Sequence, residues 1–197
     1  MSQLFETIKF QNDKLHNLNL HNARLNKSRF ELFGCKDTID LGGSIHFPET
    51  YDNGVYKCKV IYARKIEHIE FLTYTIKPVA TLRMVECDDI EYNHKYVNRR
   101  CFDNLLENVG ADDILIIKRG FITDSSYANI VFYDGRKWIT PSTPLLRGTK
   151  REKLLKEKLI SEQPIKKDEL RFFTKAKLIN AMIDMEDSPV IKIRNIY

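Results

Sequence analysis

The sequence predicts an α+β protein built from two lobes. Apolar and polar residues alternate with a period of two in several separate segments, which is typical of strands. Two further segments have apolar residues near helical spacing. With 197 residues, of which 43% are hydrophobic and 30% charged, the chain has the composition of a globular protein with a substantial core. Pro78 lies between two series of elements, so we expect a small N-terminal α/β lobe at residues 1–79 and a larger C-terminal lobe at 80–197.

The expected N-terminal lobe is mostly β-structure with one helix. Leu4–Phe10 alternates as a strand does, and Asn12–Lys14 follows as a turn. The helix ends at Phe33, because Gly34 suits the left-handed conformation that closes many helices. The expected elements in order are strands 4–10 and 15–18, a helix at 20–33, and strands 55–62 and 66–76.

The C-terminal lobe alternates strands with short helices. Asp134-Gly135 is a typical hairpin turn. In the helix at 149–160, Glu152 and Lys156 form an i,i+4 pair opposite an apolar face. The expected elements are strands 81–85, 114–118, 129–133, 138–140 and 190–193 with helices 96–109, 149–160 and 175–181.

Cysteine and histidine spacing argues against a metal site. The cysteines are widely spread without any C-x-x-C pair, which suits reduced thiols in a cytoplasmic protein rather than zinc ligands or disulfides. The histidines form no pair at helical or hairpin spacing. The N-terminus, Met1–Glu6, lacks the features of a secretory signal, and no apolar run approaches the roughly 20 residues that span a bilayer. We therefore expect a cytoplasmic protein without metal or membrane partner.

The net charge of +5 comes from mixed charges of both signs. The densest basic run, Arg147–Lys158, is broken by Glu152 and Glu157. A nucleic-acid binder more often gathers its basic residues on one face with aromatics between them. We therefore expect a mild attraction for anionic small molecules and no nucleic-acid partner. A basic nucleic-acid-binding module remains an alternative because the pI is about 8.9.

Three features have the residue types that cofactor chemistry uses. Lys95 stands beside His94, Arg99 and Arg100, whose charges disfavour the ammonium form, and only a neutral amine attacks a carbonyl. Taken alone, Lys95 is more simply read as one of the chain's many solvated lysines.

The second feature is the polar segment Thr123–Asn129 between two strands. Asp124 could pair with a protonated ring nitrogen, although an Asp- and Ser-rich turn is the simpler reading. The third is Gly148 before the helix that starts at Thr149, where backbone N–H groups, the helix dipole and a hydroxyl suit a phosphate. A plain loop-to-helix junction would look the same. The order of the three features carries more information than any one of them.

In this order the segments resemble the class IV aminotransferase family, the fold-type IV enzymes that depend on pyridoxal 5′-phosphate and include D-amino-acid aminotransferase. The resemblance covers almost the whole chain. It rests on Phe5–Ile8, His21–Leu25 with Ser28 (H-x-x-R-L), Lys95–Arg99, Thr123–Asn129 with Asp134-Gly135 and Thr140-Pro141, and Gly148–Arg151 at the place of G-x-T-R.

The resemblance implies a role for each matching residue. Lys95 would form the internal aldimine with the cofactor and move the proton between the substrate Cα and C4′. Arg24 would bind the phosphate, and Asp124 would keep the ring nitrogen protonated. The other implied cofactor contacts are backbone groups near Tyr127, the helix start at Gly148 and Thr149, and the turn at Asn180.

Several positions depart from the family pattern. Asp124 is one methylene shorter than the usual Glu, and Lys150 occupies the threonine position of G-x-T-R. Asn180–Met182 replaces a Thr/Ser pair. The chain is also short, which predicts an open site or one completed by a second subunit of a homodimer.

Two activities fit the resemblance: a lyase that converts 4-amino-4-deoxychorismate into pyruvate and 4-aminobenzoate, and an aminotransferase. A compact, open site favours the bulky cyclic substrate of the lyase. A third possibility is a catalytically degenerate binding or regulatory subunit. Retention of Lys95, Arg24 and Asp124 together argues against it, because a dead site has no chemical need for all three.

Overall fold

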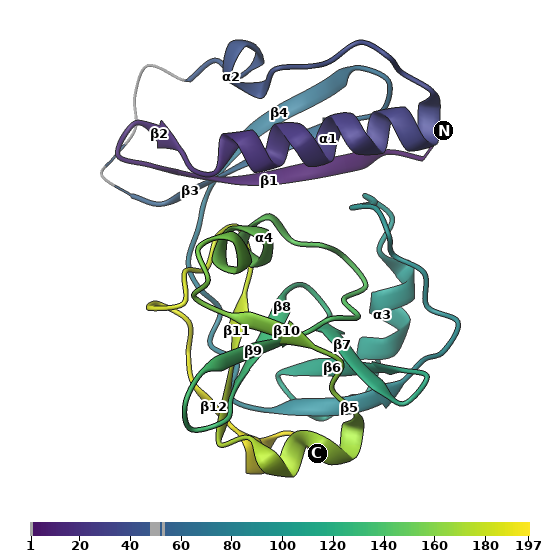
Figure 1. Cartoon of the computed structure of the whole chain (residues 1–197). Helices are drawn as coiled ribbons and strands as arrows, with labels where there is room; N and C mark the ends of the chain where they lie inside the picture. Colours follow the sequence, from purple (N-terminus) through teal and green to yellow (C-terminus); the bar gives the residue numbers. More distant parts are fainter. Residues whose placement is uncertain (1, 48–51, 53) are drawn as a thin grey trace. The chain divides into compact units, whose positions relative to one another are not determined.

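The computed structural model describes residues 2–47, 52 and 54–197. The chain forms two compact units (Figure 1). Unit 1 comprises Met1–Thr75 with His94–Asn98, and unit 2 comprises Ile76–Asn93 with Arg99–Tyr197. Both units combine helices and strands, so the predicted α+β class is confirmed.

Unit 1 is an antiparallel sheet packed against one long helix. The strand order is β2-β1-β3-β4, and β1 pairs with β3 from Leu4 opposite Tyr62 to Phe10 opposite Tyr56. Leu25 of α1 is buried in one cluster with Leu4 and Ile8 of β1, which holds the helix on the sheet. The elements are β1 (Leu4–Gln11), β2 (Lys14–Leu15), α1 (Leu18–Phe33), α2 (Leu41–Ser44), β3 (Tyr56–Tyr62) and β4 (Ile66–Thr73).

The end of α1 follows the sequence prediction. Gly34 adopts φ 66° at the C-terminal cap, and its N–H donates to carbonyls of the last helical turn. The helix begins at Leu18, so the expected strand at 15–18 is reduced to Lys14–Leu15.

Residues 94–98 group with unit 1 because they pair with the start of β1. Phe5 N donates to Lys95 O at 2.9 Å, and Val97 N donates to Gln3 O at 2.9 Å. This extended backbone rules out the helix expected from Tyr96 onward, and α3 covers only Arg100–Leu106. We expected this segment in the C-terminal lobe, whereas its hydrogen bonds join it to the N-terminal unit.

Unit 2 contains a three-stranded and a five-stranded sheet around one core. In the smaller sheet, β6 pairs parallel with β5 and antiparallel with β7. The larger sheet has the order β10-β9-β8-β11-β12. The elements of unit 2 are β5 (Leu82–Glu86), α3, β6 (Asp113–Lys118), β7 (Phe121–Ser125), β8 (Asn129–Tyr133), β9 (Trp138–Pro141), α4 (Thr149–Lys156), β10 (Ser161–Gln163), β11 (Lys175–Ile179) and β12 (Ile191–Lys192), with 3-10 turns at Lys167–Phe172 and Ile193–Asn195.

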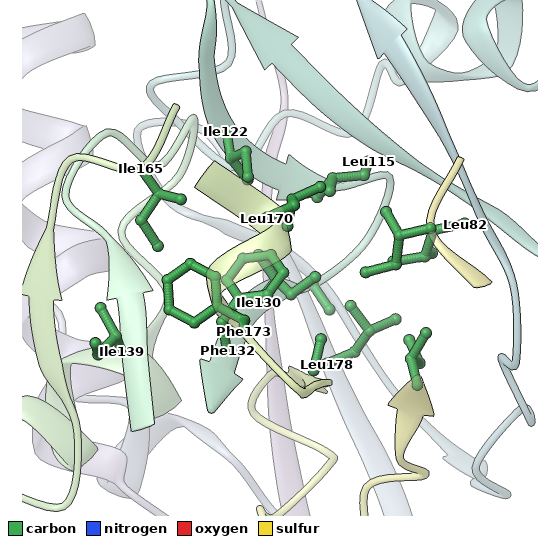
Figure 2. Close-up of a cluster of buried hydrophobic side chains, with 14 of the residues drawn as sticks. Leu82, Leu115, Ile122, Ile130, Phe132, Ile139, Ile165, Leu170, Phe173 and Leu178 are labelled. Atoms are coloured by element: carbon green, nitrogen blue, oxygen red, sulfur yellow. The ribbon is translucent and has the colours of Figure 1, made fainter. Parts of the chain in front are cut away.

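Side chains from both sheets meet in the core of unit 2. Figure 2 shows Leu82 and Leu115 of the smaller sheet in the same cluster as Ile130 and Phe132 of β8. Leu178 of β11 completes this layer. The core therefore fixes the ends of β7, β8 and β11 relative to one another.

Two predictions of local structure in this unit were wrong. Residues 175–181 form β11 and its following turn rather than a helix, because the strand pairs antiparallel with β8 and buries Ala176 and Leu178. Thr123–Ser125 belong to β7, so Asp124 lies on a strand and not on a loop. No helix in the described ranges is long and apolar enough to span a membrane.

Candidate functional site

In unit 1 a buried carboxylate organises the residues expected to bind the cofactor. Glu6 takes an inward position on β1 between Leu4 and Ile8 and is fully buried. Arg24 of α1 forms a bidentate pair with it, through Nε to Oε1 at 2.9 Å and Nη2 to Oε2 at 2.5 Å. His21, one turn earlier on α1, places Nδ1 2.6 Å from Oε2.

The surroundings of Glu6 and His21 shift the pKa values of both side chains. Burial alone would raise the pKa of Glu6, but the Arg24 charge and the hydrogen bonds from His21 and Arg24 outweigh burial and lower the pKa to about 2. Burial also lowers the pKa of His21, against the opposing effect of Glu6. Glu6 is therefore ionised and His21 neutral at pH 7, so the Nδ1–H of His21 donates to the carboxylate.

Lys95 lies next to this cluster. Its backbone carbonyl is held by β1, its Nζ lies 4.6 Å from the centroid of the Phe5 ring, and its charge contributes to the lowered pKa of His21. His94, the preceding residue, places Nδ1 3.2 Å from the Ser28 hydroxyl of α1. Unit 1 thus brings Arg24 and Lys95 together around Glu6 and His21.

In unit 2 the expected ring-nitrogen partner is buried and hydrogen-bonded. Asp124 Oδ1 accepts from Asn129 Nδ2 at 2.7 Å, and Oδ2 accepts from Leu146 N at 3.0 Å. Burial raises the pKa of Asp124 to about 6, although these hydrogen bonds oppose the shift. A carboxylate has about four lone-pair sites, so Asp124 keeps acceptor capacity beyond these two contacts.

The close approach of Asn129 leaves no room for a side chain at Gly148. A Cβ built on Gly148 would lie 2.1 Å from Asn129 Oδ1, closer than any tolerable contact. Asn129 is itself buried and fixed by its donations to Asp124 and to Leu146 O at 2.9 Å. We expected a glycine here because it lets a phosphate approach the backbone, and the structure adds a packing reason, the Asn129 amide.

Gly148→Ala should therefore destabilise the protein. We expect a loss of about 1 to 3 kcal/mol, because the Asn129 amide must leave its hydrogen bonds to admit the methyl group. Chemical denaturation measures the change. Gly43→Ala is the matched control, since its Cβ would lie at an ordinary 3.6 Å from Asp40 Oδ2. Equal stability of the two variants would contradict this role of Gly148.

The start of α4 is tied to the turn after β11. Lys150 is buried and pairs with Asp184. Asn180 Oδ1 accepts from Met182 N at 2.9 Å and from Ile183 N at 3.1 Å, so it shapes this turn. Ile179 lies opposite Asn129 in the β11–β8 register. The segments expected to hold the ring and the phosphate therefore converge within unit 2.

Thr149 and Tyr127 have different surroundings. Thr149 is buried in the first turn of α4. The backbone N–H groups in the first turn of an α-helix have no acceptor within the helix. The Tyr127 side chain packs against the core of unit 2, and its backbone N–H lies 3.4 Å from the Ser125 hydroxyl.

Comparison with known proteins places the chain in a family. A family model described as Amino-transferase class IV matches residues 90–193, which is more than half of the sequence. An uncharacterized protein of Haemophilus influenzae (strain ATCC 51907 / DSM 11121 / KW20 / Rd) is 40% identical over 185 residues, covering 92% of this chain and 98% of the relative. The chain belongs to the class IV aminotransferase family.

Solved structures agree with this class IV assignment. A protein from Haemophilus somnus 129pt named putative 4-amino-4-deoxychorismate lyase superposes with a TM-score of 0.83 at 33% identity, covering 92% of this chain and 97% of that one. The PLP-bound form of a hypothetical aminotransferase from Mycobacterium tuberculosis gives a TM-score of 0.71 at 14% identity, covering 96% and 80% of the two chains. The predicted fold-type IV architecture is confirmed.

Three residues that contact the candidate site residues or their neighbours were not predicted from the sequence. Glu6 lies in the Phe5–Ile8 motif and has a usable signal, because a carboxylate at an inward strand position indicates a paired buried charge. Asn129 had no distinguishing signal before its contact with Asp124 was known. Asp184, the partner of Lys150, lies 34 residues away in sequence, which no local pattern reveals.

The raised pKa of Asp124 gives a pH prediction for this class IV protein. The folded state disfavours the ionised carboxylate, so stability should fall as the pH rises from about 4 to about 6, by about 3 kcal/mol in total. Asp124→Asn should lack this fall, whatever its absolute stability. Denaturation of the native protein and of Asp124→Asn across this range, without added cofactor, gives the slope of unfolding free energy against pH for each protein. Identical slopes would contradict the burial of an ionisable Asp124.

Proposed function

We propose that this chain is a pyridoxal 5′-phosphate-dependent enzyme that acts on a small amino-group-bearing substrate through Lys95. The observation that carries the proposal is the backbone hydrogen bond that holds Lys95 on β1, beside the Glu6–His21–Arg24 cluster. One unit thereby holds an amine and a guanidinium that would react with the aldehyde and bind the phosphate of the cofactor. Membership of the class IV family and the PLP-bound relative support the choice of cofactor.

The donor set fits this cofactor chemically. Lys95 supplies the primary amine, and Arg24 supplies a guanidinium whose orientation is set by its pair with Glu6. Asp124 supplies a buried carboxylate with a pKa of about 6, which is mostly ionised at pH 7 and above. The start of α4 adds backbone N–H groups suited to an anion. These residues provide the three kinds of partner that an aldehyde, a phosphate and a pyridinium nitrogen need.

Each residue has a defined task in this proposal. The bound cofactor would supply an electron-accepting ring. Lys95 Nζ would take the proton from the substrate Cα and return it, as a general base and then a general acid. Arg24 would bind the phosphate, and Asp124 would hold a proton on the ring nitrogen.

Among family activities we propose the lyase reaction, which converts 4-amino-4-deoxychorismate into pyruvate and 4-aminobenzoate. The support is the Haemophilus somnus relative, which bears that name at 33% identity over 97% of its length. The aminotransferase reaction is the second candidate, favoured by the family description. A small-molecule substrate and a homodimeric state belong to the same proposal.

The deciding assay offers both reactions to the purified protein with saturating cofactor. One arm follows release of pyruvate and 4-aminobenzoate from 4-amino-4-deoxychorismate. The other follows amino transfer from branched-chain and D-amino acids to 2-oxo acids. Turnover in the first arm alone supports the lyase, and turnover in the second alone supports the aminotransferase. No turnover in either would favour a degenerate binding or regulatory subunit.

A further inference from the structure

Lys95 lies at the apex of a tight turn within unit 1. Tyr96 N donates to His94 O at 2.9 Å, and this bond between residues two apart defines a γ-turn centred on Lys95. Lys95 is not among the described non-glycine residues with positive φ, so the turn has the common inverse form. A single hydrogen bond closes the turn. The direction in which the Lys95 side chain leaves the backbone therefore depends on how the flanking residues are held.

The residues that follow the apex are held at the start of β1. Phe5 N donates to Lys95 O at 2.9 Å, and Val97 N donates to Gln3 O at the same distance. The Tyr96 side chain packs against the hydrophobic core of unit 1. These contacts fix the chain from Lys95 onward but leave the residue before it to be held by something else.

On that preceding side, the side chain of His94 makes the link to α1. His94 is the residue at which the chain enters unit 1, and its side chain is only 15% exposed. Nδ1 lies 3.2 Å from the hydroxyl of Ser28, which is buried on α1, and Nε2 lies 3.7 Å from Glu31 Oε2. Residues three apart on a helix share one face. Both ring nitrogens of His94 therefore approach the same face of α1.

The His94 ring also contacts the residue that follows the apex. Its centroid lies 5.9 Å from that of the Tyr96 ring at an interplanar angle of 75°, which is an edge-to-face arrangement. The two residues that flank Lys95 are thus joined twice, once through the backbone hydrogen bond and once through their rings. One imidazole connects the turn to α1 and closes it at the same time.

We propose that His94 is a positioning residue for Lys95: it holds the turn against α1 and Tyr96 and so sets the direction of the Lys95 amine. The assignment rests on the proposed function and deepens it. Attack on an aldehyde and transfer of a proton both need the nitrogen close to the reacting atom and correctly aligned. A turn that is held on both sides of Lys95 restricts the positions that Nζ can reach before the cofactor arrives.

The first arm of the test is amide hydrogen exchange of the protein without cofactor, measured residue by residue by NMR. The reporter amides are those that donate the hydrogen bonds of this segment: Phe5, Tyr96 and Val97. His94→Ala should speed their exchange about tenfold, because the turn opens more often. The Ile45 amide, hydrogen-bonded at the end of α2, should keep its rate. Ser28→Ala removes only the hydroxyl and should give a smaller change at the same reporters.

The second arm follows how fast the absorbance band of attached pyridoxal 5′-phosphate appears after mixing. His94→Ala should slow attachment about tenfold. His94→Asn should recover part of this loss, because its amide keeps a hydrogen-bonding group near the place of Nδ1. His68→Ala is the matched control and should attach the cofactor as the native protein does. Its Nε2 also lies near a glutamate, 3.9 Å from Glu70 Oε2, but its side chain is 60% exposed on β4.

The assignment requires both effects in His94→Ala. If the native protein forms the band and either the exchange of the reporter amides or the attachment rate is unchanged in the variant, His94 is wrongly assigned and the proposed function stands. Equal acceleration of Ile45 and the reporter amides means a general loss of stability, which also overturns the positioning role. If the native protein forms no band, the proposed function fails and the assignment falls with it.

Discussion

Replacing Lys95 with alanine is expected to lower turnover at least about a thousandfold. Loss of the nucleophilic amine removes both the covalent attachment of the cofactor and the group that moves the Cα proton, and such losses are typically this large. Turnover is measured with whichever substrate the native protein accepts, at saturating pyridoxal 5′-phosphate.

The fold of Lys95→Ala should survive, because the hydrogen bond that joins residue 95 to β1 uses its backbone carbonyl. Lys77→Ala is the control, since Lys77 is exposed and its Nζ lies at the 3.5 Å hydrogen-bond limit from Asp112 O. The control should keep native turnover. A folded Lys95→Ala protein that turns over within tenfold of the native rate would remove Lys95 from the mechanism.

Replacing Glu6 with glutamine should cost about 3 to 5 kcal/mol of unfolding free energy at pH 7. The change leaves Arg24, whose side chain is only 15% exposed, without its anion, and it turns one of the two oxygens that accept from Arg24 and His21 into an NH2 donor. Breaking one partner of a buried pair is usually this expensive. Chemical denaturation of the two proteins gives the difference directly.

The same carboxylate predicts how acid weakens the native protein. Because folding lowers the pKa of Glu6 from 4.5 to about 2, its stabilising contribution is present above pH 4.5 and disappears as the pH falls toward 2. The shift corresponds to about 3 kcal/mol, which Glu6→Gln should no longer lose in acid. Glu67→Gln, a change at an exposed residue, should behave as the native protein does. Native-like stability of Glu6→Gln at pH 7 would show that the cluster contributes little to folding.

The elements that sequence predicted best are those with strong local signals. β1 alternates clearly and α1 ends at a glycine, and both appear near their expected bounds. β11 failed because Lys175–Ile179 contains residues that favour helices, and only pairing with β8 makes it a strand. β7 was hidden for a similar reason: Thr123–Ser125 is polar, yet it is buried by pairing with β6.

The residues of the candidate site also divide into those with a local sequence signal and those without one. The motif order made Arg24, Lys95 and Asp124 candidates for the site, since each lies in a short recognisable segment. The residues that hold them come from distant parts of the chain: Glu6 is 18 residues from Arg24, and Leu146 is 22 residues from Asp124.

The most direct test of the account is to add pyridoxal 5′-phosphate to the native protein, reduce it with borohydride, and map the modified peptide by mass spectrometry. The account predicts a yellow absorbance band before reduction and one pyridoxyl group fixed afterwards on Lys95. Modification spread over several exposed lysines, or none at all at saturating cofactor, would contradict it.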